Sequence, residues 1–538
     1  MQKKGKLELT WVGKYNEEKL EPRILVEDKT KSYGNPNTEN MLIHGDNLIA
    51  LKSLEQDFAG KIKCIYIDPP FNTGQAFENY DDNLEISIWL SLMRKRLEIL
   101  RNLLSEDGTL FVHIDSENLG YLMVLLDEIF LRHNRLYTVT FKQGAATGHK
   151  AINPGCVTTT NFILMYAKDK SQWKPNKVYT AKKRDDRYGK FITNIQDDCR
   201  KWNIVTLTEA FASYKNTDIK TARKIIKESP EAIERFVIEH SDAVIRTARP
   251  DYESVGKEIK DKISESKAKS NEILYLNRDN NSDMYFINGE RILFYKDKLK
   301  LIDGQLISGE PLTTLWDDIL SNNLHNEGGV SFPKGKKPEY LIKRVLELAT
   351  QEGDFVLDSF LGSGTTAAVA HKMKRKWIGI EMGEQCYTHC LFRLKEIVNG
   401  EQGGISQSVN WQGGGGFKFY ELAESLLVKS KVLPIYQLNS NYTFDMVVEA
   451  ICKIEGFKYS PYGEFHGYSS ENRFIHVTSE FVNSKYIMSL MKSLGKNQSL
   501  LIYCTKMQSD MNIPDNVEVK KIPQALLEKC NFESEVEQ

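Results

Sequence analysis

Four residues at the end of a predicted strand have the types needed to hold a ligand. Asp68-Pro69-Pro70-Phe71 follows the apolar, β-branched segment KCIYI. Proline restricts the backbone, so the Asp68 carboxylate and the Pro69 carbonyl would be acceptors in fixed positions beside the flat face of Phe71. Ligands of open α/β sheets bind at the carboxyl ends of the strands. The motif therefore indicates a ligand site, although a structural turn stiffened by proline has the same sequence.

A second candidate site lies far along the chain. The segment DSFLGSGTT, residues 358–366, stands between the predicted strand FVLD and a predicted helix. Glycines let a ligand approach the backbone, and the helix N-terminus supplies free N–H groups. Glu381 ends the next predicted strand, WIGIE, where a carboxylate can bind both hydroxyls of a ribose. Together these features favour a nucleotide-like cofactor, while no GxxxxGK[ST] phosphate loop occurs and FLGSGTT departs from the GxGxxG of dinucleotide-dependent oxidoreductases.

The segments that must position these motifs alternate between strands and helices. Strands are predicted at MLIH, KCIYI and GTLFVHI, and the apolar spacing of residues 86–104 predicts a helix. The alternation breaks after about residue 140 and resumes with the helix PEYLIKRVLELAT and the strands FVLD and WIGIE. Strands that alternate with helices predict an α/β fold with a mainly parallel sheet and right-handed crossovers.

Taken together, the motifs resemble those of amino-group DNA methyltransferases. DPPF precedes DSFLGSGTT, which is the permuted order of the β class of these enzymes. The segments IHGDNLIALKSL, IDPPFNTG, LWDDI, FPKGKKPEYLIKRVLELAT and VNWQGGGGFKFYEL are similar to the modification (Mod) subunits of type III restriction-modification systems. The resemblance covers about residues 40–420. It implies a Rossmann-like, S-adenosylmethionine-dependent methyltransferase fold with an inserted target-recognition domain and a small α/β C-terminal domain.

The resemblance also implies a role for each matching residue. The catalytic motif Asp68, Pro69, Pro70 and Phe71 would hold the target base. The residues implied for S-adenosylmethionine binding are Asp46, Asp68, Asp358, Phe360, Gly362, Gly364, Thr365, Glu381, Lys337 and Pro338.

Within the cofactor set the implied contacts differ. Glu381 would bind the ribose, and Asp46 would lie near the adenine ring or the amino group of the cofactor. Lys337 and Pro338 would lie on the segment that closes over the methionine end. The other members would surround the methionine part.

The chemistry of an exocyclic amine fits the first motif. Such an amine is a poor nucleophile when conjugated to a purine ring. The Asp68 carboxylate and the Pro69 carbonyl would each accept one N6 hydrogen and align the lone pair toward the methyl group. A duplex base must flip out to reach such a site and would stack on Phe71, a contact worth about 1–3 kcal/mol. The family often has Tyr at this position, so no step should depend on a hydroxyl.

Composition and charge limit the other classes of protein. Net charge is −1 at pH 7, but basic residues outnumber acidic ones between Lys142 and Lys190, which predicts local DNA contact. No run of about 18 apolar residues predicts a membrane span. No apolar signal core follows Met1–Lys6, so we expect a cytoplasmic protein. The eight cysteines form no CxxC pair, so we expect no metal site.

We expect six segments along the chain. They are an N-terminal arm (1–40), the catalytic half of the methyltransferase domain (41–140), a target-recognition insert (141–310), the cofactor-binding half (311–400), a Gly-rich linker (401–416) and a C-terminal assembly or partner domain (417–538). Residues 142–150 are expected in a loop near the flipped base.

The prediction is a site-specific, adenine-specific DNA methyltransferase that modifies N6 of a flipped adenine in duplex DNA. The resemblance implies a type III modification subunit with double-stranded DNA, a second copy of the chain and a helicase-nuclease subunit as partners. Three alternatives stay open: a solitary adenine methyltransferase without a nuclease, an N4-cytosine methyltransferase, and a DNA-recognition subunit that mainly lends specificity to a nuclease. An RNA or protein substrate would leave the insert unexplained.

Overall fold

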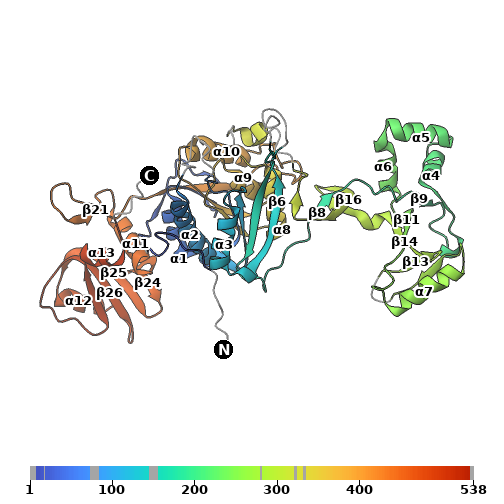
Figure 1. Ribbon diagram of the computed structural model, residues 1–538. Helices are drawn as coiled ribbons and strands as arrows, with labels where there is room; N and C mark the ends of the chain where they lie inside the picture. Colours follow the sequence, from blue (N-terminus) through green and yellow to red (C-terminus); the bar gives the residue numbers. More distant parts are fainter. Residues whose placement is uncertain are drawn as a thin grey trace. The chain divides into compact units, whose positions relative to one another are not determined.

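A computed structural model gives the structure of the chain (Figure 1). It describes residues 8–16, 19–72, 84–144, 155–278, 282–319, 324–330, 332 and 335–532. The chain divides into two compact units, one formed by residues 1–176 with 313–538 and the other by residues 177–312. None of the helices in the described ranges is long and apolar enough to cross a lipid bilayer.

One sheet of eleven strands, counted within the described residues, organises the first unit. Its order is β1-β20-β3-β19-β18-β4-β5-β7-β6-β17, with β2 paired to β20. In this order the strands are β1 (Leu25–Glu27), β20 (Gly416–Leu422), β3 (Met41–His44), β19 (Lys376–Glu381), β18 (Phe355–Asp358), β4 (Ile62–Ile67), β5 (Leu104–Ile114), β7 (Thr160–Ala167), β6 (Arg135–Lys142) and β17 (Leu315–Trp316), and β2 is Tyr33–Gly34. Neighbours from β20 to β5 are parallel, whereas β7 is antiparallel to both β5 and β6.

Two groups of helices accompany this sheet. Helices α1 (Asn47–Phe58), α2 (Ile86–Leu103) and α3 (Leu119–Phe130) pack on one another and share one buried core with the strands. The other group comprises α8 (Glu339–Ala349), α9 (Thr365–Lys372) and α10 (Phe392–Val398), with a π-helix at Cys386–Leu391 before α10. The chain crosses the sheet in opposite directions in its two halves, so right-handed crossovers place the two groups on opposite faces. Short 3₁₀ segments lie at Arg132–Asn134 and Leu324–Gly329.

The expected start of the insert at residue 141 differs from the structure. Strand β7 pairs with β5 along Thr109–Ile114 and belongs to the central sheet. The compact second unit begins only at residue 177. The strand–helix alternation breaks near residue 140 because β6 and β7 form an antiparallel pair, not because the chain leaves the sheet.

The expected Gly-rich linker at 401–416 is also corrected by the structure. Ile405, Ser406 and Trp411 are buried. Gly415 has φ +76°, and a Cβ there would lie 2.8 Å from His371 Nε2, so glycine permits a close approach. Strand β20, which begins at Gly416, joins the central sheet beside β3, so the segment is packed structure and the methyltransferase sheet continues to residue 422.

The described residues of the second unit form two sheets. Their orders are β10-β9-β11-β14-β13-β12 and β15-β16-β8. The elements in chain order are β8 (Tyr179–Ala181), β9 (Lys190–Ile192), a 3₁₀ turn (Cys199–Lys201), β10 (Ile204–Thr206), α4 (Leu207–Tyr214), α5 (Ile219–Glu228), α6 (Pro230–Glu239), β11 (Val244–Ala248), α7 (Lys257–Ala268), β12 (Leu274–Leu276), β13 (Met284–Ile287), β14 (Glu290–Phe294), a 3₁₀ turn (Tyr295–Lys298), β15 (Leu299–Ile302) and β16 (Gln305–Pro311). Pro230 separates α5 from α6, because proline lacks the N–H that a helix interior requires. Several buried clusters within these residues give the unit its own core.

The residues after β20 form a second sheet domain within the first unit. Its sheet order is β23-β24-β25-β26-β27, with a separate β21-β22 hairpin. The elements are β21 (Leu427–Lys429), β22 (Tyr436–Leu438), α11 (Phe444–Glu455), β23 (Lys458–Tyr462), β24 (Phe465–Ser470), β25 (Arg473–Val482), α12 (Ser484–Met491), β26 (Ser499–Met507), β27 (Val517–Lys521) and α13 (Gln524–Lys529). Ile24 from the N-terminal segment belongs to its buried core, and Glu21 accepts the N–H of Leu426 at 2.8 Å. The domain is therefore docked on the N-terminal segment.

Candidate active site

The two sequence motifs meet at the carboxyl ends of neighbouring parallel strands. Leu357 of β18 pairs with Ile65 of β4, Asp358 ends β18, and Asp68 follows shortly after β4. Strand β18 leads to β19 on one side, and β4 leads to β5 on the other. This is the topological switch point at which open α/β sheets bind ligands, so motifs far apart in sequence form one site.

The half-buried Asp68 carboxylate has one engaged oxygen and one buried, unpaired oxygen. Its Oδ2 forms an ion pair with the Lys337 ammonium, and the side chains are 19% and 10% exposed. Its Oδ1 is buried and has no hydrogen-bond partner within the described residues. Burial raises the pKa of Asp68, and the Lys337 charge and hydrogen bond act in the opposite direction. The free oxygen is therefore an acceptor available to a ligand.

The backbone of the DPPF turn is held by side chains on two helices. Trp89 Nε1 donates to the Pro70 carbonyl at 2.9 Å, and Asn118 Nδ2 donates to the Phe71 carbonyl at 2.7 Å. Asn72 adopts a left-handed backbone conformation at φ +57° and exchanges hydrogen bonds of 2.8 and 2.9 Å with the backbone of Leu84. Trp89 belongs to the buried core and also fixes this turn.

Among the described residues, the Phe71 ring has His113 and Lys337 as polar neighbours. The His113 ring stacks with it at a centroid distance of 5.8 Å and an interplanar angle of 22°. The Lys337 ammonium lies 5.2 Å from the ring centroid. His113 is fully buried and bonded through Nδ1 to Tyr66 Oη at 2.9 Å. Burial, together with Lys337, places the pKa of His113 well below its ordinary value, so the imidazole is neutral at physiological pH.

The Gly-rich loop is shaped by Asp358. This carboxylate accepts the Phe360 N–H at 2.9 Å and the Thr366 hydroxyl at 2.6 Å. Burial raises the pKa of Asp358 to about 7, although both hydrogen bonds oppose the rise. Gly362 and Gly364 have φ of +57° and +83°, a region that L side chains rarely adopt. A Cβ on Gly364 would lie 3.4 Å from Cys390 Cα in the π-helix, so the loop also packs closely on that helix.

Glu381 stands at the end of β19, beside the Gly-rich loop. Its Oε2 accepts the Gly362 N–H at 2.6 Å, and its Oε1 accepts Gln385 Nε2 at 2.8 Å. The N–H groups of Met382 and Gly383 also point to Oε1, at 3.1 and 3.3 Å. A carboxylate has about four acceptor positions, so a ribose hydroxyl would have to share them.

Asp46 and Pro338 both stand at helix starts near the motifs. Asp46 Oδ1 caps α1 by accepting the Ile49 N–H at 3.0 Å, and its Oδ2 pairs with Arg96 at 3.3 Å. The next residue, Asn47, donates to the Ser359 carbonyl at 2.7 Å, which ties α1 to the Gly-rich loop. Pro338 is the N-cap residue of α8.

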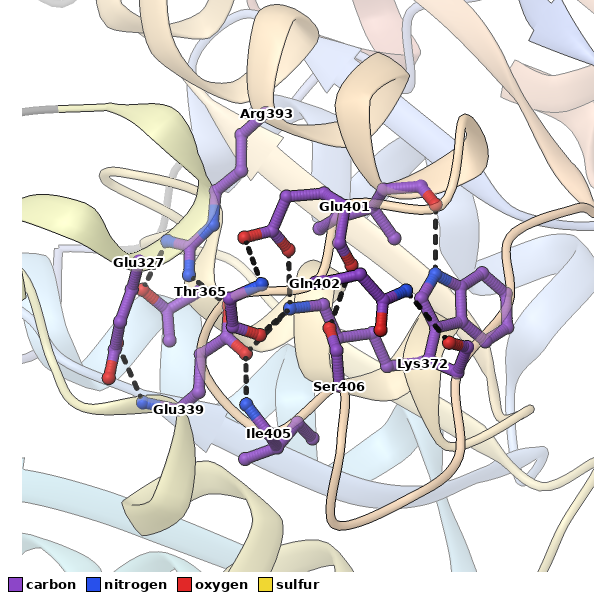
Figure 2. A network of polar contacts seen from close by, with 12 residues as sticks. Glu327, Glu339, Thr365, Lys372, Arg393, Glu401, Gln402, Ile405 and Ser406 are labelled. Atoms are coloured by element: carbon purple, nitrogen blue, oxygen red, sulfur yellow. Dashed lines mark hydrogen bonds and ion pairs between the residues drawn. The ribbon is translucent and has the colours of Figure 1, made fainter.

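A buried ion cluster connects α8, α9 and α10 and contacts Thr365, which follows the Gly-rich loop (Figure 2). Glu339 accepts Lys372 Nζ at 2.9 Å and Arg393 Nη2 at 2.7 Å, and all three side chains are fully buried. Arg393 also donates to the Thr365 hydroxyl at 2.8 Å, and Lys372 pairs with Glu401 at 2.8 Å. We call these five residues the Glu339 cluster. The cluster fixes Thr365 at the start of α9.

One predicted feature lies largely outside the described residues. The loop expected near the target base spans residues 142–150, and residues 145–150 are not among those described. Among the side chains that the structure does describe, no group of three His, Cys, Asp or Glu could hold a metal ion. His113, Glu339, Lys372, Arg393 and Glu401 were not predicted as site residues because each is a single residue outside the two motifs.

Comparisons with known proteins identify a family model and several relatives that match most of this chain. The family model described as DNA methylase matches residues 62–391. The probable type III restriction-modification enzyme HindVI Mod subunit of Haemophilus influenzae is 38% identical over 427 residues, which cover 74% of this chain and 55% of that protein. The type III EcoPI Mod subunit of Escherichia phage P1 is 27% identical, over 73% of this chain and 64% of its own length. The chain thus spans less than two thirds of the length of these curated relatives.

A search of solved structures gives distant likenesses. The putative DNA modification methylase TTHA0409 of Thermus thermophilus, in complex with S-adenosyl-L-methionine, has a TM-score of 0.34 and 12% sequence identity. The match covers 71% of this chain and 99% of that one.

Proposed function

Because this chain belongs to the DNA methylase family, with the family model matching residues 62–391, we propose that it transfers a methyl group from S-adenosylmethionine to N6 of a flipped adenine in duplex DNA. The fold is the expected Rossmann-like methyltransferase fold in permuted order. The observation that carries the proposal is the free, buried Oδ1 of Asp68 beside Phe71 at the switch point.

The residues present fit S-adenosylmethionine as the cofactor. Glycine suits the positive φ angles at Gly362 and Gly364, and among the described residues a Cβ on Gly362 would meet only the Phe360 carbonyl, at 4.0 Å, so the backbone there is not covered by neighbouring atoms. The Ser359 hydroxyl is buried there without a hydrogen-bond partner within the described residues. The carboxylates of Asp358 and Glu381 accept the hydrogen bonds described above, and an ammonium group or a ribose hydroxyl would share these acceptors. These residues, with Phe360 and Thr365, would hold the cofactor.

Bound S-adenosylmethionine supplies an electrophilic methyl group on a sulfonium centre. Asp68 Oδ1 would accept one hydrogen of the adenine amino group, and the Pro69 carbonyl the other. This pairing orients the nitrogen lone pair without a metal ion. The acceptors are preorganised because Trp89 and Asn118 hold the turn that carries them, so little reorganisation is needed as positive charge develops on the amine.

Phe71 would bind the target base by stacking. Its ring is supported by the neutral His113, which adds no charge at this position. Phe71 has no hydroxyl, so it would contribute only contact area, worth about 1–3 kcal/mol. The base leaves the duplex to reach this ring.

Modification mapping tests this proposal directly. The chain is expressed in a methylation-deficient host, and modified bases are mapped by long-read sequencing. N6-methyladenine at one recurring sequence is expected, and Asp68→Ala is the control that should leave the genome unmodified. N4-methylcytosine in place of N6-methyladenine would refute the assignment of the target base, and no modification would refute the activity.

We assign target recognition to the second unit, residues 177–312. It has its own core and lies in the chain between β7 and β17. Its basic residues are partly neutralised, since Lys182 pairs with Glu310 and Arg184 with Glu234. Exchanging this unit for that of a relative should change the modified sequence and leave the methylated atom unchanged; an unchanged site would place recognition elsewhere.

We further propose that the chain acts as a type III modification subunit in a dimer and with a helicase-nuclease subunit. The support is the similarity to Mod subunits. Truncation at residue 416 would remove β20 from the central sheet, so the test uses the full chain. Light scattering with and without DNA should give the mass of a dimer at micromolar concentration, and a monomer under both conditions would refute the dimer.

A further inference from the structure

Lys337 occupies a position that its sequence motif does not indicate. The resemblance implies a place at the methionine end of the cofactor. In the structure its ammonium instead pairs with Asp68 Oδ2 and lies 5.2 Å from the Phe71 centroid. It therefore contacts the two residues to which the proposed function gives the target base. With 10% of its side chain exposed, it is held in this position and not extended into solvent.

The backbone next to Lys337 is anchored by the Glu339 cluster (Figure 2). Glu339 stands two residues later, with its carboxylate between Lys372 and Arg393. The Glu339 N–H donates to the Glu327 carboxylate at 3.1 Å. Pro338 is the one residue between Lys337 and this anchor, and its ring restricts the backbone there. Few backbone torsions therefore remain to move the lysine away from Asp68.

We propose that Lys337 is a positioning residue for methyl transfer, which engages Asp68 Oδ2 so that the carboxylate stays ionised and presents Oδ1 to the target amino group. This inference rests on the proposed function. Lys337 acts through Asp68. It explains why Oδ2 is engaged in an ion pair whereas Oδ1 has no hydrogen-bond partner within the described residues.

The charges around Asp68 determine what removal of Lys337 would do. The described titratable groups that interact with this carboxylate or with Lys337 are Lys337, Asp358, Tyr66 and His113. His113 is neutral, and Asp358 is a like charge when ionised. Lys337 is thus the positive member of this set, and without it burial would raise the pKa of Asp68 further.

A pH–rate profile tests the role in transfer. Single-turnover methylation of a site-bearing duplex is measured from pH 5.5 to 9 for wild type, Lys337→Met and Lys337→Arg. Transfer requires ionised Asp68, so activity falls as the pH drops through its pKa. In Lys337→Met this acidic limb should move up by about 1–3 pH units, which is the usual effect of an opposite charge at this range. In Lys337→Arg the acidic limb should lie close to its wild-type pH, because arginine keeps the positive charge.

A stability measurement provides a readout that does not depend on activity. Because burial raises the pKa of Asp68 above its unfolded value, its ionisation opposes folding, and stability falls as the pH rises toward the folded pKa. In Lys337→Met this fall should continue to higher pH than in wild type. Adding Asp68→Asn should abolish the difference in slope, as followed by the melting temperature at each pH.

The matched control is Lys336→Met. Lys336 is the adjacent buried lysine, and its ammonium binds the backbone carbonyls of Glu327 and Val330, not Asp68. This variant should lower stability without moving the acidic limb.

Two results would overturn the inference. One is a uniform loss of rate in Lys337→Met with the limb and the stability slope unmoved, which indicates a structural role. The other is a loss of S-adenosylmethionine affinity, measured by calorimetry, while the acidic limb of the pH–rate profile stays in place. That result would show that Lys337 binds the cofactor and does not act through Asp68. Failure of the proposed function looks different, because the wild type itself would then transfer no methyl group to adenine while the stability slopes could still differ.

Discussion

Replacement of Glu339 by Gln removes one charge from the centre of the Glu339 cluster. The amide has the same shape as the carboxylate, so packing is preserved. Lys372 keeps Glu401 as a partner, but Arg393 loses its carboxylate. The variant therefore leaves a fully buried guanidinium without its ion-pair partner, although the charge of Glu327 still acts on it.

The expected cost follows from this geometry. Breaking a buried ion pair by removal of one partner costs about 3–5 kcal/mol. Unfolding entropy is about 2 cal/mol/K per residue, so for a unit of about 400 residues this corresponds to a melting temperature lower by about 4–6 °C. Arginine and lysine hold the pKa of Glu339 below its ordinary value although burial acts against them. The stabilisation is thus present at neutral pH and is lost as the pH falls below about 4.5 toward the folded pKa.

Calorimetry of the full chain measures these effects. Glu401→Gln is the matched control, because Glu401 is 15% exposed and contacts only one of the two cations. Its loss should cost clearly less than that of Glu339. Adding Arg393→Met to Glu339→Gln removes the guanidinium that has lost its partner. The double variant should therefore lose less unfolding free energy than the two single variants lose together, by about 1–3 kcal/mol.

Simple additivity of Glu339→Gln and Arg393→Met would refute this reasoning. So would equal effects of Glu339→Gln and Glu401→Gln, since burial would then not decide the cost. A third contrary result would be that Glu339→Gln lowers the free energy of unfolding by the same amount at pH 4 as at pH 7.

Three further predictions concern the proposed site. Asp68→Ala should abolish methyl transfer, because the lost carboxylate hydrogen bond is the one made to the target amine. Affinity for S-adenosylmethionine should stay within about twofold of wild type, and substantial remaining transfer would contradict the role of Asp68. Gly364→Val should weaken cofactor binding through strain at φ +83°, and Glu381→Ala should weaken it by about 1.5–3 kcal/mol; unchanged affinity in both variants would exclude this loop as the cofactor site. Asp358, whose pKa burial raises to about 7, should lower stability as the pH rises from about 4 to 7, so Asp358→Asn should flatten the melting profile in that interval; an unaltered slope would show that another group titrates there.

The sequence predicted the elements on which the motifs depend because their patterns are local. β-Branched runs placed β4 and β18, and the apolar spacing of 86–104 placed α2. The FLGSG turn was recognisable because glycine at positive φ has few substitutes. These features need no knowledge of distant residues.

The supporting contacts could not be predicted in this way. His113 reads as an ordinary strand histidine, and its stacking on Phe71 depends on the pairing of β4 with β5. The Gly-rich segment reads as a flexible linker, yet glycines there allow close packing against His371. Lys337 was matched to a motif, but the partner of its ammonium is set by the tertiary fold.

The permuted strand order has a consequence for synthesis on the ribosome. Strands β3 and β4 are made early and joined by α1, yet two strands, β19 and β18, stand between them in the sheet. A nascent chain that ends before residue 381 therefore carries a gap with unpaired strand edges, a known source of aggregation. The 177–312 unit has its own core, and it emerges complete while the gap is still open. Slow translation across residues 313–381 should therefore favour aggregation of this chain, whereas the 177–312 unit should fold regardless of that pause.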